Sequence, residues 1–465
     1  MTKHDHPGGN HYGLRVLQTY MPLLPSSQAP AGDGPQGLVL APFRGVRYAE
    51  DRVSGLAEVT SPPYDVIAAD IENELIAADP HNIVRLILPR HLAGQPGSPY
   101  DDAAAELSGW LADGILVPDP EPALYVYEQA MAGHAGVAVL QRGLIGTVGL
   151  VPPDAGIIQP HENVAPPVVT GRRQLMEATE ANLEPVFLLY EGDGGAATRL
   201  VDEVASTRAP AMEASTHDGL RHRLWALTGE EEVAAIAADL APRTALIADG
   251  HHRYAAYLQL RERLHGAGAG HGPWDSGLAL LVDSTAYPPQ LGAIHRVVTG
   301  LVTEAAARLA TAAFEVRELP GGSADVPAAL GELANAAAEG VCFLLTGARR
   351  AYLLTKPDPA IVSAAVTDQP GELWQQVPAA VLQDVLFARL WGVDDDERSV
   401  RAIHDAAAAI AAAEEAPHGT AVICSPMSAS QVYQVAALGR RVPRKSTSFG
   451  PKPRTGLVMR LFAES

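Results

Sequence analysis

The chain has 465 residues, 47% of them hydrophobic and 19% charged, and its formal net charge at pH 7 is −20. It is too long for one ordinary core, so we expect two or three domains. The negative charge argues against nucleic acid as a partner, because phosphate backbones bind basic faces. The two cysteines exclude a disulfide scaffold and a CxxC metal site.

The chain also lacks an apolar run of membrane-spanning length and a basic-then-apolar leader. These absences predict a cytoplasmic protein that acts on small molecules without a membrane or nucleic acid, and an oligomer is compatible with them. Residues 1–36, rich in Pro, Gly and His, predict a flexible lead-in.

Apolar periodicity in the first part of the chain predicts strands mixed with helices. The strands of 123–129 and 140–150 are expected to form an antiparallel pair. Residues 38–48 are expected to form a strand followed by a turn. We expect further strands at 123–129, 140–150, 185–190, 245–248, 278–283 and 291–298, and helices at 101–113, 171–184, 230–240 and from 251.

From about residue 300, Ala-rich helices alternate with short strands, which indicates a second α/β lobe. We expect helices at 303–312, 326–338, 373–390 and 400–414, and strands at 341–345, 351–356 and 421–424. The predicted fold class is α/β (α+β), with a mixed-sheet catalytic core at 37–300 and the second lobe at 301–465.

The stretch TALIADGHHRYAAY predicts a buried strand, a turn at Asp249-Gly250 and a helix that opens at His251. Free N–H groups and the helix dipole at such a start form an anion site. His251, His252 and Arg253 could grip the same anion. Cations are unfavourable at a helix start, and a bound phosphate would explain them. The alternative is an Asp N-cap followed by solvated polar residues.

Three further groups are candidates for the same site. The Pro62-Pro63 pair displays Tyr64 and Asp65 at a fixed angle, as a site wall or as a loop in which Asp65 caps a helix. His161-Glu162 leaves a strand as an acid–base pair, a metal pair or a solvated loop pair. His295-Arg296, on another strand, suggests that strand ends converge on an anion.

The segment Arg440–Arg454, RRVPRKSTSFGPKPR, is called the basic segment below. It holds six basic residues and no acidic one. Its prolines and its glycine exclude a regular helix. Lys445, Ser446, Thr447 and Lys452 could offer ammonium, hydroxyl and backbone donors to phosphate. It is not a Walker A motif, and the alternative is a basic surface tail.

Six motifs together resemble a bacterial family catalogued as a domain of unknown function. In order they are FRGVRY, PPYDVI, LYVYEQ, PHEN, ADGHHRY and PRKSTSFGPK, and they span roughly residues 38–460. The DGHHRY motif is also similar to a segment of the ParB/sulfiredoxin-like fold, in which a strand, turn and helix hold nucleotide or phosphate groups. Some relatives with this segment are free L-serine kinases.

The resemblance implies a phosphotransferase that converts free L-serine to O-phospho-L-serine. Pyrophosphate is the favoured donor and ATP or ADP are compatible, since the chain lacks a Walker A motif and an evident adenine pocket. Mg²⁺ would bridge donor oxygens and be held by Asp249 or Asp65. Glu162 or Asp65 would take the hydroxyl proton, and Arg44 or Arg296 would bind the amino-acid carboxylate.

The full set of candidate residues divides by role. The candidate catalytic residues are Asp65, Glu162, Asp249, His251, His252 and Arg253. The candidate substrate- and phosphate-binding residues are Arg44, Tyr64, His161, Gly250, Tyr254, His295, Arg296, Lys445, Ser446, Thr447 and Lys452. The alternatives are a phosphohydrolase on a small phosphorylated metabolite, a non-catalytic nucleotide-binding switch, and a zinc hydrolase using His161, Glu162, His251 and His252.

Overall fold

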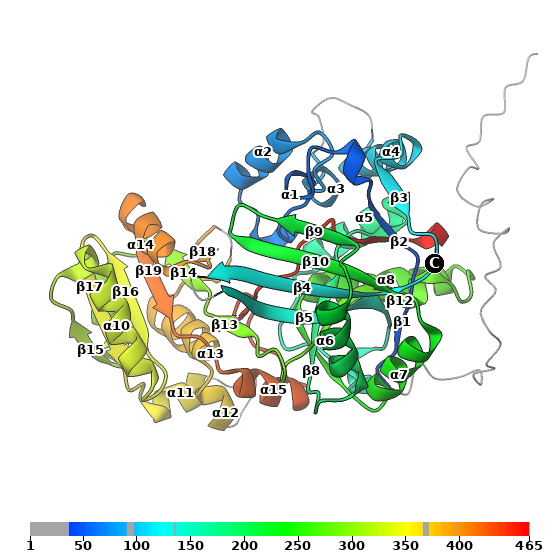
Figure 1. Ribbon diagram of the computed structural model, residues 1–465. Helices are drawn as coiled ribbons and strands as arrows, with labels where there is room; N and C mark the ends of the chain where they lie inside the picture. The colour runs from blue at the N-terminus through cyan, green and yellow to red at the C-terminus, as the bar shows by residue number, and fades with distance from the viewer. Residues whose placement is uncertain (1–36, 91–96, 134–135, 366–371, 397, 465) are drawn as a thin grey trace, which may run out of the picture.

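The computed structural model describes residues 37–90, 97–133, 136–365, 372–396 and 398–464 (Figure 1). Its centre is a nine-stranded sheet in the order β6-β11-β8-β12-β5-β4-β10-β9, with β1 paired to β5. The pairs β6–β11 and β8–β12 are parallel, and the others are antiparallel. The predicted mixed-sheet α/β fold class is therefore confirmed. The lead-in predicted at residues 1–36 lies outside the described residues.

The strands of this sheet bury both faces. Tyr125 and Tyr127 point into one apolar cluster, and Leu124 and Val126 point into another on the opposite face. The predicted antiparallel pair of 123–129 and 140–150 is confirmed as β4 and β5. The strands are β1 (Leu40–Ala41), β4 (Leu124–Gly133), β5 (Gly136–Gly149), β6 (Ile158–Gln159), β8 (Val186–Tyr190), β9 (Met212–Ser215), β10 (Leu220–Leu227), β11 (Ala245–Asp249) and β12 (Ser276–Asp283).

Helices cover this sheet, and a small sheet β3-β2-β21-β7 lies beside it. The small sheet consists of β2 (Gly45–Tyr48), β3 (Leu116–Pro118), β7 (Ala181–Asn182) and β21 (Met459–Leu461). The helices are α1 (Leu56–Val59), α2 (Ala69–Ala78), α3 (Val84–Ile87), α4 (Pro99–Ala112), α5 (Pro166–Thr179), α6 (Ala196–Thr207), α7 (Glu230–Leu240) and α8 (His251–Gly266). None of the helices within the described ranges is both long and apolar enough to cross a membrane.

A second, antiparallel sheet has the order β15-β17-β16-β19-β14-β18 and lies at the left of Figure 1. Its strands are β14 (His295–Val298), β15 (Glu315–Glu318), β16 (Phe343–Gly347), β17 (Arg350–Thr355), β18 (Val400–Ile403) and β19 (Thr420–Cys424). The helical segments of this part of the chain are α9 (Thr303–Ala310), α10 (Val326–Ala337), α11 (Pro359–Ala365), α12 (Glu372–Gln375), α13 (Pro378–Ala380), the π-helical segment η6 (Val381–Trp391), α14 (Ala406–Glu415) and α15 (Ala429–Ala437).

The chain passes once from the nine-stranded to the six-stranded sheet, and afterwards it joins the two small sheets. Strand β14 precedes residue 300 yet belongs to the six-stranded sheet. After α15, strand β20 (Ser448–Gly450) pairs with β13 (Gln290–Gly292), and β21 pairs with β2 and β7. The domain limits of 37–300 and 301–465 stay a prediction.

Several predicted elements are divided in the structure. The stretch 38–48 contains β1 and β2, which join different sheets, and the helix expected at 171–184 ends at Thr179 and is followed by β7. The strand expected at 291–298 splits into β13 and β14, which join different sheets. The helix expected at 373–390 is interrupted before Pro378, which has no N–H to continue a helix. The helix expected at 400–414 begins only at Ala406, because Asp405 caps it by accepting the N–H of Ala408 at 2.7 Å.

Candidate active site

The candidate active site surrounds the turn from β11 into α8. Strand β11 ends at Asp249, Gly250 has a φ of +92°, and α8 begins at His251, as predicted. A Cβ on Gly250 would lie 3.0 Å from Nε of Arg253, so both the backbone and the space favour glycine. Gly250 provides no side-chain cap. The first turn of α8 therefore presents backbone N–H groups and the positive end of its dipole.

The two histidines of this turn are neutral at pH 7. Nε2 of His251 accepts the backbone N–H of His161 at 3.3 Å, and Nε2 of His252 accepts that of Ala165 at 3.0 Å. Burial and nearby positive charges lower the pKa of His251 well below its usual value and that of His252 to about 4. Neutral rings remove the unfavourable cations expected at this helix start. The contact of His251 and His252 with an anion stays a prediction.

Arg253 is 1% exposed and forms a buried ion pair. It donates to Oδ2 of Asp249 at 2.5 Å and to the carbonyl of Pro185 at 2.7 Å, and it lies 3.9 Å from Oε1 of Glu184. Burial opposes its charge, but Glu184, Asp249 and Asp65 together hold the pKa of Arg253 above its usual value. Its charge is therefore already balanced by protein carboxylates.

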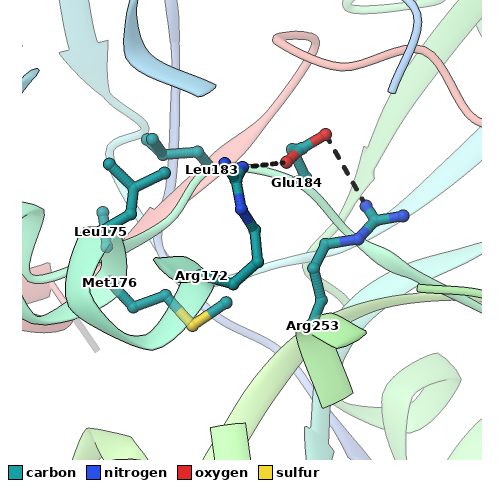
Figure 2. A pocket seen from close by; sticks show the side chains of 7 residues that line it. Arg172, Leu175, Met176, Leu183, Glu184 and Arg253 are labelled. Carbon is teal, nitrogen blue, oxygen red and sulfur yellow. Dashed lines mark ion pairs between the residues drawn. The ribbon is translucent and has the colours of Figure 1, made fainter. Parts of the chain in front are cut away.

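Figure 2 shows a small pocket beside Arg253, with about 270 Å³ of empty space including the part open to solvent. The guanidinium of Arg172 lies 3.8 Å from Oε2 of Glu184, so Arg172 and Arg253 approach the two oxygens of the same carboxylate. Arg172 also stacks on the ring of Tyr64, 4.1 Å from its centroid. Glu184 Oε1 accepts the backbone N–H of Tyr64 at 3.1 Å and thereby fixes the Tyr64-Asp65 pair beside Arg253.

Lys452 joins the two aspartates that the sequence assigned to a metal. Its ammonium group donates to Oδ1 of Asp249 and, at 3.1 Å, to Oδ2 of Asp65. Burial opposes the ionisation of Asp65, but Lys452, Arg253 and Lys445 outweigh it and lower the pKa of Asp65 to about 2. Asp65, Asp249, Lys452 and Arg253 thus form one network of two carboxylates and two cations.

Arg296 and Glu162 hold the basic segment over this network. Arg296, 4% exposed, donates to the carbonyl of Lys445 at 2.9 Å and to that of Arg444 at 3.3 Å. Lys445 has a φ of +59°, and its backbone N–H donates to Oε1 of Glu162 at 2.5 Å. The Lys445 ammonium forms no ion pair with any residue that the structure describes. It is therefore available to an anion.

Other contacts fix the segment further along. Thr447 Oγ1 lies 2.7 Å from Nε2 of His161, and burial lowers the pKa of His161 to about 4. Ser446 Oγ donates to the carbonyl of Pro443. The predicted residues His161, Ser446 and Thr447 are thus brought to the site, and their contacts shape the segment.

Glu162 has the pKa of a general base for neutral pH. Burial and, more weakly, Asp249 raise its pKa to about 7, although the N–H and charge of Lys445 and the charge of Arg296 oppose the shift. Its Oε2 accepts no hydrogen bond from the described part of the chain. That oxygen can accept a proton from a substrate.

Several residues of the site are not among those predicted from the sequence. Gln129, at 0% exposed, and Gln141, at 3%, donate to the carbonyls of Lys452 (2.9 Å) and Pro451 (2.8 Å). His404, at the corner between β18 and α14, lies 3.2 Å from Ser448 Oγ through Nδ1. The signal for the glutamines was their polarity within apolar strands, and the pocket residues Arg172 and Glu184 gave no motif signal.

Three predicted residues make their contacts elsewhere. Arg44 donates to the carbonyl of Asp119 at 2.6 Å and pairs with Glu464 at 2.8 Å. Tyr254 donates to the carbonyl of Val151 at 2.7 Å within the apolar cluster under α8. The Nδ1 of His295 accepts the N–H of Cys424 at 3.2 Å. The structure does not bring these side chains to the Lys452 network.

The described residues with metal-ligand spacing form one cluster, His265, His271 and Asp275, at the other end of α8. His161, Glu162, His251 and His252 are not in it. At the predicted metal position, both aspartates already contact Lys452. The side chains as arranged do not offer a vacant pair of ligands.

Comparison with curated proteins gives no match. Among solved structures, a free serine kinase in complex with AMP is similar at 15% identity and a TM-score of 0.32, over 65% of this chain and 89% of that chain. SbnI from Staphylococcus aureus, truncated at its C-terminus, is similar at 12% identity and 0.33, over 67% and 85%. A conserved hypothetical protein from Pyrococcus furiosus is similar at 14% identity and 0.34, over 67% and 94%.

These TM-scores all lie below 0.5. A family model described as "Protein of unknown function (DUF1015)" matches residues 40–380, most of the chain. The chain therefore belongs to the DUF1015 family.

Proposed function

We propose that the protein is a phosphotransferase that moves a phosphoryl group from a small donor to the hydroxyl of free L-serine. The observation that carries the proposal is the position of Glu162. This carboxylate, with a pKa of about 7, contacts the backbone of Lys445 next to the uncapped start of α8. A base poised for neutral pH and an anion site on one turn are what phosphoryl transfer to a hydroxyl requires.

The donor phosphates bind at the first turn of α8 in this proposal. Backbone N–H groups and the helix dipole attract an anion there, and the unpaired ammonium of Lys445, whose charge lowers the pKa of His252 in that turn, adds a positive charge. Lys452, between Asp65 and Asp249, lies at the edge of the same space. Pyrophosphate is the favoured donor, since it needs only such oxygen-binding contacts, and ATP or ADP are compatible with them.

The transfer step balances as follows. The serine Oγ attacks one phosphorus of pyrophosphate, the bond from that phosphorus to the bridging oxygen breaks, and orthophosphate leaves. The Oγ proton moves to Glu162. Glu162 is a better base than Asp65, because a carboxylate with a pKa of about 2 holds a proton too weakly. Serine as the acceptor is supported by the similarity of the DGHHRY motif to free serine kinases.

Mg²⁺ enters the proposal as a counter-ion that accompanies the donor and neutralises its oxygens. Asp65 and Asp249 do not fit the role of its ligands in the arrangement described, because Lys452 contacts both. No step of the reaction is assigned to a metal at these carboxylates.

Phosphorus NMR tests the proposal. The full-length protein is incubated with L-serine and Mg²⁺ and, in parallel, with pyrophosphate, ATP or ADP. The expected result is a phosphomonoester resonance with pyrophosphate that depends on serine. Orthophosphate alone, formed equally without serine, would instead establish a phosphohydrolase. No change with any donor, together with tight nucleotide binding, would establish a binding switch.

A further inference from the structure

The ammonium group of Lys452 occupies the space between two aspartates of the site. Its ammonium group contacts one oxygen of Asp65 and one oxygen of Asp249, which belong to segments far apart in the sequence. The side chain of Lys452 is only 14% exposed. One or two carboxylates are also what a protein usually contributes to a Mg²⁺ site. Lys452 therefore lies where a divalent metal ion could be expected.

The lysine is held there by its backbone. The buried Gln129 and Gln141 donate to the carbonyls of Lys452 and Pro451, at 2.9 and 2.8 Å. The preceding strand β20 pairs with β13. Because a strand and two buried amides fix the main chain before and at Lys452, the ammonium group does not leave the two aspartates by a shift of the backbone.

Charge opposes a metal ion beside this lysine. Arg253 already neutralises Oδ2 of Asp249 at 2.5 Å, so the carboxylate pair faces two protein cations. A divalent ion between the aspartates would meet both at short range, where repulsion is weakly screened. Oδ1 of Asp65 is buried and has no partner among the described side chains. The carboxylates therefore retain metal-binding capacity that the lysine masks.

We propose that Lys452 is a resident cation of the active site and that its ammonium group takes the place between Asp65 and Asp249 where a metal ion would otherwise bind. The two aspartates then orient this ammonium toward the start of α8. The description of this place as an active site rests on the proposed function. The occupancy of a metal position by Lys452 does not depend on any reaction.

Manganese binding to the full-length protein, without donor or serine, tests the inference by electron paramagnetic resonance and calorimetry. Wild type is expected to show no Mn²⁺ site that depends on Asp65. Lys452→Met is expected to gain one, with affinity stronger than wild type by at least about tenfold. The gain should disappear in Lys452→Met/Asp65→Asn, which removes one ligand. Lys445→Met, in the same segment but at a lysine whose ammonium group forms no ion pair among the described residues, should behave as wild type.

Two results would overturn the inference. One is a wild-type Mn²⁺ site that Asp65→Asn or Asp249→Asn abolishes, because the metal would then displace Lys452. The other is a folded Lys452→Met protein, verified by circular dichroism, that gains no site. If Lys452→Met does not fold, the wild-type titration and the charge-retaining Lys452→Arg, which should gain no site, still decide it. Failure of the phosphotransferase assay leaves all of these binding results unaffected.

Discussion

Glu162 is the residue whose protonation should govern the reaction. Burial raises its pKa to about 7, and its Oε2 has no partner in the described chain. As a base it must be ionised, so kcat/KM should fall as the pH drops below about 7. Glu162→Gln should lower kcat by roughly 10² to 10⁴-fold. A pH–rate profile checks both.

The matched control for this residue is Asp65→Asn. Asp65 has a pKa near 2, so its removal should leave the acid limb of the profile in place, whatever it does to the rate. An acid limb that persists unchanged in Glu162→Gln would show that another group is the base.

Glu162 should also mark the pH dependence of stability. The pKa of Glu162 is about 7 in the folded protein, against 4.5 for a glutamate in the unfolded chain. Between these values the folded protein keeps a proton that the unfolded chain has lost, so the free energy of unfolding falls as the pH rises. Glu162→Gln removes this term. It should therefore gain stability relative to wild type from pH 4.5 to 8, measured by urea unfolding. A constant difference across that range would contradict the assignment.

At this scale the sequence predicted the side chains of the site better than their contacts. Asp65, Glu162, Asp249 and Lys452 do come together, because their motifs follow strands or rigid turns. The sequence pattern did not indicate that burial and the positive charge of Lys445 lower the pKa of His252 and keep its ring neutral. Such effects depend on neighbours that lie far away in the sequence. The roles of these residues stay predictions.

At the scale of elements, the turn into α8 should be sensitive to a single methyl group. Gly250→Ala forces a positive φ on alanine and crowds Arg253 Nε at 3.0 Å. The strain should cost roughly 1–2 kcal/mol of folding free energy. Gly266→Ala, in the last turn of α8 with nothing within 4 Å, is the control and should not destabilise. Equal stability of the two variants in urea would contradict this account of the turn.

The elements that the sequence predicted well are those with strong local signals. The strand–turn–helix at Asp249-Gly250 is correct because an apolar run, Asp-Gly and a helical pattern follow one another. The predicted start of the helix at residue 400 was wrong, because residues 400–403 pair with β14 and form a strand. That pairing joins segments about a hundred residues apart in the sequence. The local hydrophobic periodicity of a segment does not indicate which distant strand it pairs with. Because the strand ends at residue 403, His404 lies at the corner before α14, where it contacts Ser448.

At the scale of the whole molecule, the site lies where the two large sheets meet. The nine-stranded sheet supplies β11, and Arg296 on β14 of the six-stranded sheet holds the basic segment against it. Arg296→Ala should release Lys445 and raise the KM for the donor, with up to roughly 10²-fold loss of kcat/KM. Steady-state kinetics checks this.

Arg317 provides the control on the same sheet. Its guanidinium forms an exposed pair with Glu332, so Arg317→Ala should leave the kinetics unchanged. Equal kinetics for Arg296→Ala and wild type would show that the six-stranded sheet does not position the basic segment for catalysis.

In the proposed reaction, this site transfers a phosphoryl group to free serine with Glu162 as the base. The most direct measurement is the formation of O-phospho-L-serine from pyrophosphate and L-serine, followed by phosphorus NMR in wild type and Glu162→Gln at pH 8. We expect one phosphoserine for each orthophosphate released by wild type and a strongly reduced rate in the variant. Orthophosphate release without phosphoserine, or equal rates in both proteins, would contradict it.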